Sequence, residues 1–271
     1  MSKPLPSYGK PPVVETVVGV QFTPIAGWTV AHFGLYWNAI RDSFPKFECR
    51  PAIESQVESF EPPSAPAGPR FRLTDAAASS RGLYLDSVDG QVLIQVQADR
   101  FLFNWRKGES EADYPRYTEY VQPEFEKHFL GFRDFLTSEG LEPPSVKQCD
   151  VTYLNHIPQG HGWDTDADWH EVFTFMKYDH FEFLPVPADG RFNLNFTLPE
   201  KKGRLRVSAH RAVRPHDGAQ IVVLDLTARG KPSGNEVADI REFQSQCREW
   251  IVRGFTELTS ERLHELWQRE S

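Results

Sequence analysis

Cysteine is scarce in this chain of 271 residues, which contains only three. Cys49, Cys149 and Cys247 lie far apart and form no Cys-x-x-Cys pair, so the sequence offers neither a zinc ribbon nor a dithiol redox motif. An odd, sparse set of cysteines is typical of a reducing compartment, because disulfides persist mainly in oxidising ones. We therefore expect a cytoplasmic location.

Long apolar runs are also missing. No stretch approaches the ~20 residues that a helix needs to cross a bilayer. Residues 1–12, with the sequence MSKPLPSYGKPP, lack the hydrophobic core of a signal peptide and are expected to form an N-terminal tail. No membrane partner is therefore predicted.

The common catalytic motifs are absent from the sequence as well. It contains no Gly-x-x-x-x-Gly-Lys phosphate loop, no Gly-x-Gly-x-x-Gly fingerprint, no Gly-x-Ser-x-Gly elbow and no His-Glu-x-x-His pattern. These absences favour a non-enzymatic role, and we expect no cofactor.

One titratable cluster keeps a hydrolase or metal-dependent enzyme as an alternative. His156, His161 and His170 stand close together in sequence, with an Asp-x-Asp-x-Asp stretch between them. That spacing is similar to a calcium loop, but Trp169 and Phe175 occupy the positions where the loop needs glycine and glutamate. Aspartates ahead of a helix are more typical of caps, so no metal site is predicted.

Positive charge is in the minority, and the net charge of -8 argues against a protein that coats nucleic acid over its whole surface. Between Arg191 and Lys231, however, nine lysines and arginines stand against three acidic residues. Such a patch favours docking to something negative, and nucleic-acid binding through residues 191–231 is a second hypothesis. Basic residues at strand edges also protect sheets from aggregation, which is the alternative role.

Hydrophobic periodicity predicts an alternation of strands and helices in the first part of the chain. The hairpin turn is expected at Asp99 and Arg100, and the proline-rich residues 61–69 are expected to form a loop. The predicted strands cover residues 13–22, 47–60, 70–75, 82–88 and 91–106, and the predicted helices cover residues 28–40 and 117–138.

The second part repeats this order: strand, turn with tryptophan, short helix, several strands and a long helix. The repetition predicts a duplicated α+β unit of helix-grip or TATA-binding-protein-like type, with curved antiparallel sheets and long helices on one face. The units are expected at residues 13–146 and 147–271, packed closely together. The predicted strands of the second unit cover residues 149–157, 181–185, 191–198, 205–213 and 220–227. A short helix after Trp163 is expected to hold residues 169–176, and two further helices cover residues 236–258 and 261–269.

The hairpin at residues 91–106 carries an unusual polar stripe. Its apolar face is explained by burial against helices, at ~1.5 to 3 kcal/mol for each large side chain. The opposite face collects Gln95, Gln97, Asn104 and Arg106, whose amides and guanidinium suit specific hydrogen bonding. The alternative is a solvated sheet face, for which any polar residues would serve.

Further polar residues follow nearby strands and turns. Arginines among them would bind carboxylate or phosphate in a bidentate manner. The additional candidate binding residues are Tyr114, Arg116, Tyr117, Tyr153, Asn155, His156, Arg204 and Arg206.

A set of short motifs covers most of the chain and is densest from residue 11 to residue 156. The motifs are PPVVE (11–15), GVQF (19–22), LIQVQ (93–97), DRF (99–101), NWR (104–106), YPRY (114–117) and TYLNH (152–156). With these motifs the chain resembles a sporadically distributed, uncharacterised family of bacterial proteins of about this length. The patchy occurrence of that family is similar to that of genes moved with mobile elements, including defence and toxin–antitoxin cassettes, which implies a partner-binding role.

The polar stripe, in the absence of a recognised catalytic set, leads to the first functional hypothesis. We expect a non-enzymatic binding or accessory protein that engages another protein through its polar sheet face. The alternatives are nucleic-acid binding through residues 191–231 and a hydrolase or metal-dependent enzyme around the three histidines.

Overall fold

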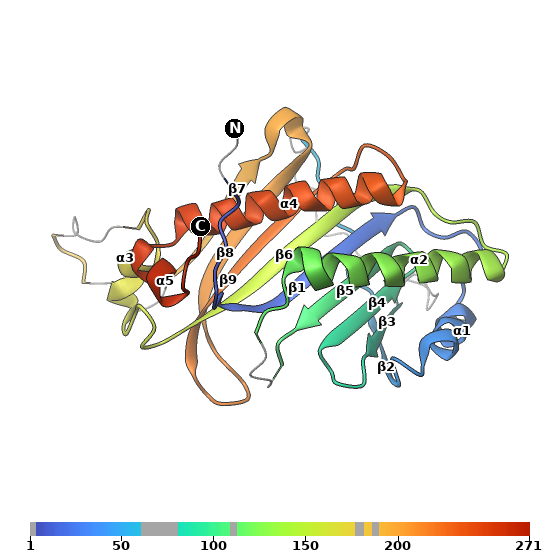
Figure 1. Cartoon of the computed structure of the whole chain (residues 1–271), viewed down its shortest axis with the longest axis horizontal. Helices are drawn as coiled ribbons and strands as arrows, with labels where there is room; N and C mark the ends of the chain where they lie inside the picture. Colours follow the sequence, from blue (N-terminus) through green and yellow to red (C-terminus); the bar gives the residue numbers. More distant parts are fainter. Residues whose placement is uncertain (1–3, 61–80, 109–112, 177–181, 186–189) are drawn as a thin grey trace.

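The computed structural model describes residues 4–60, 81–108, 113–176, 182–185 and 190–271. It is an α+β protein in which nine antiparallel strands form one large sheet (Figure 1). The first part of the chain contains β1 (Val13–Phe22), α1 (Val30–Ile40), β2 (Lys46–Pro51), β3 (Arg81–Asp86), β4 (Val92–Gln97), β5 (Arg100–Arg106), a π-helical turn (Tyr117–Val121) and α2 (Gln122–Ser138). The second part contains β6 (Val146–Pro158), α3 (Trp169–Val172), β7 (Arg191–Thr197), β8 (Gly203–Val213), β9 (Gln220–Gly230), α4 (Val237–Leu258) and α5 (Glu261–Leu266).

The strand order across the sheet is β2-β3-β4-β5-β1-β6-β9-β8-β7. The first strand of each part, β1 or β6, therefore lies at the centre, next to the last strand of its own part. β1 and β6 pair with each other from Val13 to Phe22, with shifts in register near both ends. One continuous sheet thus joins the two parts, in place of separate sheets.

Most predicted elements are found where the periodicity placed them, and β1 has the predicted bounds. The hairpin turn lies at Ala98 and Asp99, one residue earlier than expected, because Gln97 pairs with Arg100. The backbone N–H groups of Phe22 and Ile25 donate hydrogen bonds to the two carbonyls of the turn, those of Asp99 and Ala98. The observed register of β4 and β5 differs from the predicted register by an even number of residues. Each side chain of the hairpin therefore points to the predicted face of the sheet.

Two predicted strands are wrong in the described residues. The strand expected at residues 47–60 ends at Pro51, and residues 52–60 form no strand because the face of the sheet binds them instead, as described below. Residues 182–185 form bends in place of the strand expected at 181–185. The strand expected at 70–75 and the proline-rich loop at 61–69 lie outside the described residues.

The two long helices lie on the same face of the sheet (Figure 1). α2 contacts β5 and β1, whereas α4 contacts β6, β9 and β8. Apolar residues at helical spacing account for this packing, since burial of each large side chain contributes ~1.5 to 3 kcal/mol. The buried helix residues other than Gln122 and Gln244 are Phe125, Phe129, Phe132, Phe135 and Leu136 in α2, and Ile240, Phe243, Cys247, Ile251 and Phe255 in α4.

Residues 4–12, expected to be a tail, are bound to the other end of the chain. Tyr8 forms a β-bridge with Arg269, and the Gly9 N–H donates to the carbonyl of Gln268 at 2.9 Å. The Tyr8 ring is buried and makes edge contacts with Phe255 and Trp267. Among the described residues, no helix is both long and apolar enough to cross a membrane.

Candidate functional site

The structure distributes the candidate residues over the two faces of the sheet. The hairpin stripe, Arg204 and Arg206 lie on the face opposite the long helices, and a cluster of tyrosines lines a pocket beneath α4. His156 lies near the end of β6, outside the pocket.

The hairpin stripe is not an open surface. Gln95, Gln97 and Asn104 are only 7%, 2% and 4% exposed. Gln95 donates to Asn104 at 3.2 Å, and Asn104 donates to the Glu15 carboxylate at 2.6 Å. Arg106 forms an ion pair with Asp86. The stripe is therefore largely shielded from solvent, although both amide atoms of Gln97 and the Gln95 amide oxygen have no hydrogen-bond partner in the described residues.

A second group of polar side chains lies beside the stripe, on the same face of the sheet, which the long helices leave uncovered. Directly paired residues of neighbouring strands project to the same side, and the pairs Gln21 with Arg100 and Asp150 with Arg229 place four polar side chains together. We call this group the polar face. Its members are Gln21 (β1), Arg100 (β5), Gln148 and Asp150 (β6), Arg204 and Arg206 (β8), and Arg229 (β9).

Residues 54–60, which we call the strap, lie across the polar face. The carbonyl of Gln56 accepts a hydrogen bond from the Gln148 amide at 2.8 Å, and the Glu58 N–H donates to the oxygen of that same amide at 2.8 Å. Arg100 donates to the Glu54 carbonyl at 3.1 Å. The backbone of the strap is therefore held at alternate residues, as an extended peptide would be.

The Glu58 carboxylate is the most tightly held group of the strap. Arg206 donates to both of its oxygens, at 2.8 and 3.0 Å, and Arg204 donates to one of them at 3.1 Å. Arg229 lies 4.0 Å from the carboxylate, whose side chain is only 4% exposed. Such charge-assisted, bidentate contacts are stronger than neutral hydrogen bonds.

The four arginines of the polar face interact with carboxylates of the sheet as well as with the strap. Arg229 lies 3.4 Å from Asp150 and 4.0 Å from Glu58, and it also interacts with Asp225. Burial raises the pKa of Asp150, while the charge of Arg229 and the amide of Gln21 oppose the rise. Burial also lowers the pKa of Arg100.

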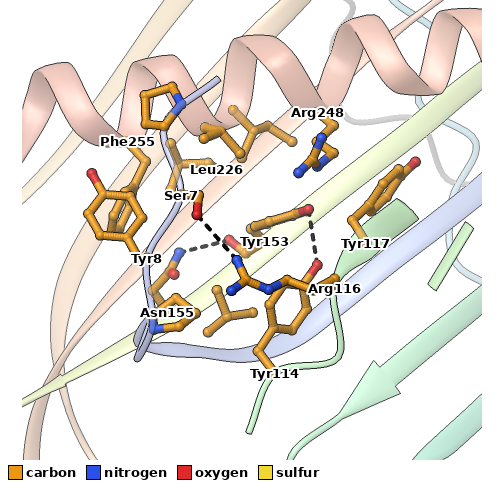
Figure 2. A pocket seen from close by; sticks show the side chains of 15 residues that line it. Ser7, Tyr8, Tyr114, Arg116, Tyr117, Tyr153, Asn155, Leu226, Arg248 and Phe255 are labelled. Carbon is orange, nitrogen blue, oxygen red and sulfur yellow. Dashed lines mark hydrogen bonds between the residues drawn. The ribbon is translucent and has the colours of Figure 1, made fainter. Parts of the chain in front are cut away.

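Five of the candidate residues line a pocket between α4, β6 and the N-terminal segment (Figure 2). They are Tyr114, Arg116, Tyr117, Tyr153 and Asn155. Leu226, Ile251 and Phe255 supply part of the apolar wall. The π-helical turn that starts at Tyr117 and the β6 strand bring these residues together from distant parts of the chain.

Hydrogen bonds fix part of the pocket. Tyr114 donates to the Tyr153 hydroxyl at 3.1 Å, and the Asn155 amide donates to the Leu224 carbonyl at 3.1 Å. Arg116 forms an ion pair with Glu270 at 3.3 Å, so its charge is compensated. Burial raises the pKa of the Tyr114 and Tyr153 hydroxyls, which keeps them protonated and able to donate.

The three histidines do not form a metal centre in the part of the chain that the structure describes, where no group of three or more His, Cys, Asp or Glu could hold a metal ion. His161 and His170 are exposed, and the His170 ring bonds to the Ala167 carbonyl. Burial lowers the pKa of His156, with Arg214 acting in the same direction. Asp168 accepts hydrogen bonds from two backbone N–H groups of its own loop, in keeping with a structural role.

Several site residues were missed from the sequence. No sequence pattern distinguishes Gln21, Gln148 and Asp150 from the other polar residues of their strands. Glu58 was missed because its segment was predicted to be a strand. Arg248 gave a usable indication, because it stands on α4 beside Cys247 and three residues before Ile251, both of them buried. A charged residue so close to a buried face is unusual.

Comparisons with known proteins add no functional information. No family model matches the chain, and no curated protein matches it. A solved structure with limited similarity is the di-domain ARO/CYC protein StfQ from the steffimycin biosynthetic pathway, at 11% sequence identity, with 69% of this chain and 74% of that chain covered and a TM-score of 0.19. A TM-score this low carries no structural argument.

Proposed function

We propose that the chain is a non-enzymatic binding protein that engages another protein through its polar face. The observation that supports this proposal is the strap, an extended acidic segment held at alternate residues, with the Glu58 carboxylate between Arg204, Arg206 and Arg229. The partner would present a similar segment: extended, with an exposed backbone and a Glu or Asp side chain. It would take the place of the strap on the sheet.

Different residues of the polar face bind the backbone of the strap and its acidic side chain. Gln148 binds backbone groups on both sides of residue 57, so it accepts any extended chain. The arginines bind a carboxylate, which selects an acidic side chain two residues after the bound carbonyl. The arginines of the polar face favour an acidic partner and would speed its association at low salt.

The direct test supplies the strap as a separate molecule. In one variant, residues 54–60 are replaced by a Gly/Ser linker, and a labelled peptide with the sequence of residues 52–60 is titrated into it while fluorescence anisotropy is recorded. We expect saturable binding that salt weakens and that Arg206→Met weakens by about tenfold or more, because a bidentate charged contact is lost. A peptide with Gln in place of Glu58 should bind more weakly than the parent peptide.

Two controls define the outcomes. Arg191→Met removes an exposed arginine of β7 that lies away from the strap, and it should leave peptide binding unchanged. If the peptide does not bind, but a single-stranded oligonucleotide binds in an Arg206-dependent, salt-sensitive manner, the nucleic-acid alternative replaces this proposal. If neither binds, the polar face serves only to hold the strap.

We also infer that the two parts of the chain derive from a duplicated helix-grip-like unit. What supports this inference is the order of elements: each part begins with a central strand, ends its strands beside it, and then sends a long helix across the same face. The bounds of the units would be residues 13–146 and 147–271.

We propose, from the motifs given above, that the chain belongs to the sporadically distributed bacterial family and acts in the cytoplasm, in a mobile or defence-associated system. The three free thiols, of which Cys49 is exposed, suit a reducing compartment. Fractionation of the native cells and the identity of the neighbouring genes would test both statements, and a periplasmic or secreted location would contradict the first.

A further inference from the structure

We propose that the pocket between α4 and β6 binds a small organic monocarboxylate, with Arg248 as the residue that binds its carboxylate group. This site lies on the helix side of the sheet, opposite the polar face, and it does not depend on the function proposed above.

Arg248 is the residue of the pocket whose charge has no compensation. It is half-buried on α4, its Nε is buried without a hydrogen-bond partner, and within the described residues no carboxylate pairs with its guanidinium. Its guanidinium carbon lies 5.4 Å from the centre of the Tyr117 ring. Figure 2 shows its side chain directed from α4 toward the tyrosines. A desolvated cation without a partner costs folding free energy, so its presence points to an anionic ligand.

Two further polar groups lie beside Arg248. Tyr117 is 1% exposed, and its hydroxyl has no hydrogen-bond partner in the described part of the chain. The Tyr153 hydroxyl accepts a hydrogen bond from Tyr114, so its own proton remains available. Burial raises the pKa of Tyr117 and Tyr153 well above the ordinary value, while the charge of Arg248 opposes the rise at both. Both phenols are therefore neutral donors beside a cation, the combination that a carboxylate needs.

The rest of the pocket sets the size and polarity of the ligand. Leu226, Ile251, Val252 and Phe255 line one side, and Pro11 and Val13 line another. The cavity volume is about 80 Å³. That is roughly half of the ~150 Å³ of an apolar cavity that binds benzene. The enclosed part therefore fits a carboxylate with a short apolar chain.

The charge balance favours a carboxylate over a phosphate. Arg248 offers one positive charge, and the nearby Arg116 already pairs with Glu270. A phosphate dianion would keep one charge uncompensated next to apolar side chains, which is costly. A monocarboxylate matches the single guanidinium.

Titration calorimetry at pH 7 tests the assignment. The probes are acetate, butyrate, hexanoate and benzoate. Butanol, butylamine and inorganic phosphate are the comparison compounds, because none of them combines an apolar body with one negative charge. We expect saturable binding of at least one of the acids and none of the comparison compounds. Arg248→Met should weaken that binding by about tenfold or more, and Tyr117→Phe should weaken it to a smaller extent.

The control variant is Arg253→Met, on the same helix, whose arginine pairs with Glu249 outside the pocket. It should bind the acid as the wild type does. Thermal unfolding of the ligand-free protein supplies a second measurement. Arg248→Met should keep or raise the melting temperature, because a guanidinium that pairs only with a ligand does not stabilise the ligand-free fold. The proposal is overturned if no acid binds, if phosphate binds in preference, or if Arg248→Met keeps full affinity.

Discussion

At the scale of single residues, the close approach of the β8 and β9 backbones determines which side chains the sheet can accommodate. Gly203 of β8 and Gly230 of β9 are direct partners, and the neighbouring backbone of Lys202 and Lys231 is hydrogen bonded at 3.2 Å. A Cβ at Gly230 would lie 2.6 Å from the Gly203 Cα and would also collide with the Lys202 carbonyl. The chain therefore requires glycine at this crossing, where backbone atoms cannot move aside as a flexible side chain would.

We expect Gly230→Ala to lower the free energy of unfolding by about 1–3 kcal/mol, the usual cost of overpacking. Gly131→Ala is the matched control, since its added methyl group meets nothing within 4 Å on the exposed side of α2. That change should stabilise the protein by about 0.5–1 kcal/mol, because alanine favours helix. Urea unfolding measures both, and equal effects of the two substitutions would contradict this account.

At the scale of elements, the strap and the N-terminal segment are held by tertiary contacts and have little regular structure of their own. The strap depends on the side chains of β6, β8 and β9, and residues 4–12 depend on the end of the chain after α5. The strap is expected to open independently of the core, since few buried apolar contacts hold it, whereas Tyr8 ties the N-terminal segment to the core.

Glu58→Gln should loosen the strap without unfolding the sheet. The change removes the charge from contacts with arginines that are worth about 1.5–3 kcal/mol each, so hydrogen exchange at residues 56–60 should accelerate roughly tenfold or more. The control is Glu54→Gln, because Arg100 contacts the backbone carbonyl of that residue and not its exposed carboxylate. Unchanged exchange in Glu58→Gln, or equal acceleration in α4, would refute the role assigned to this carboxylate.

The anchor of the N-terminal segment should make stability depend on pH. His264 is buried, bonds to Thr259 at 2.9 Å and contacts the Tyr8 ring. Burial lowers its pKa below the ordinary value of 6.5, and the charge of Arg269 acts in the same direction. The unfolded chain then binds the proton more readily, so the free energy of unfolding should fall as the pH drops below about 6.5.

Urea midpoints between pH 8 and pH 5, compared for wild type and His264→Gln, measure this dependence. The loss of stability on acidification should be smaller in the variant, although His128 and His156 contribute with the same sign, because burial lowers their pKa values too. Identical slopes in the two proteins would exclude His264 as a source of the pH dependence.

At the scale of the whole molecule, the sheet joins both parts of the chain into one folding unit. β1 pairs with β6 along its length, and the side chains of Val18 and Val151, which are direct partners at this junction, are both fully buried. Neither part could lose its strands without exposing the central strand of the other. The two proposed units therefore share their stability.

We expect the chain to unfold in one cooperative transition. Far-UV circular dichroism and tryptophan fluorescence should give the same urea midpoint, and Val18→Ala and Val151→Ala should shift both probes together, by a similar amount for each substitution. Separate transitions for the two probes, or a fragment of residues 13–146 that folds alone, would show independent domains.

The sequence predicted the regular elements well, because local periodicity determines them. An apolar, β-branched run identified β1, alternation identified the two faces of the β4–β5 hairpin, and helical spacing identified α2 and α4. Tyr114 and Tyr117 were selected as candidates from a proline turn, and Tyr153 and Asn155 from the end of a strand. The structure brings them into one pocket. The hairpin amides were selected too, but their burial was not foreseen, because alternation does not say what covers a face.

What the sequence by itself determined is the class of fold, the strands and helices and the face on which each side chain stands, since these follow from neighbours along the chain. Tertiary structure alone decided that the strap lies on the polar face and that Arg248 stands uncompensated above Tyr117. Arg204 and Glu58 are 146 positions apart. Contacts at such separations depend on how nine strands are ordered in one sheet, and no local pattern of residues specifies that order.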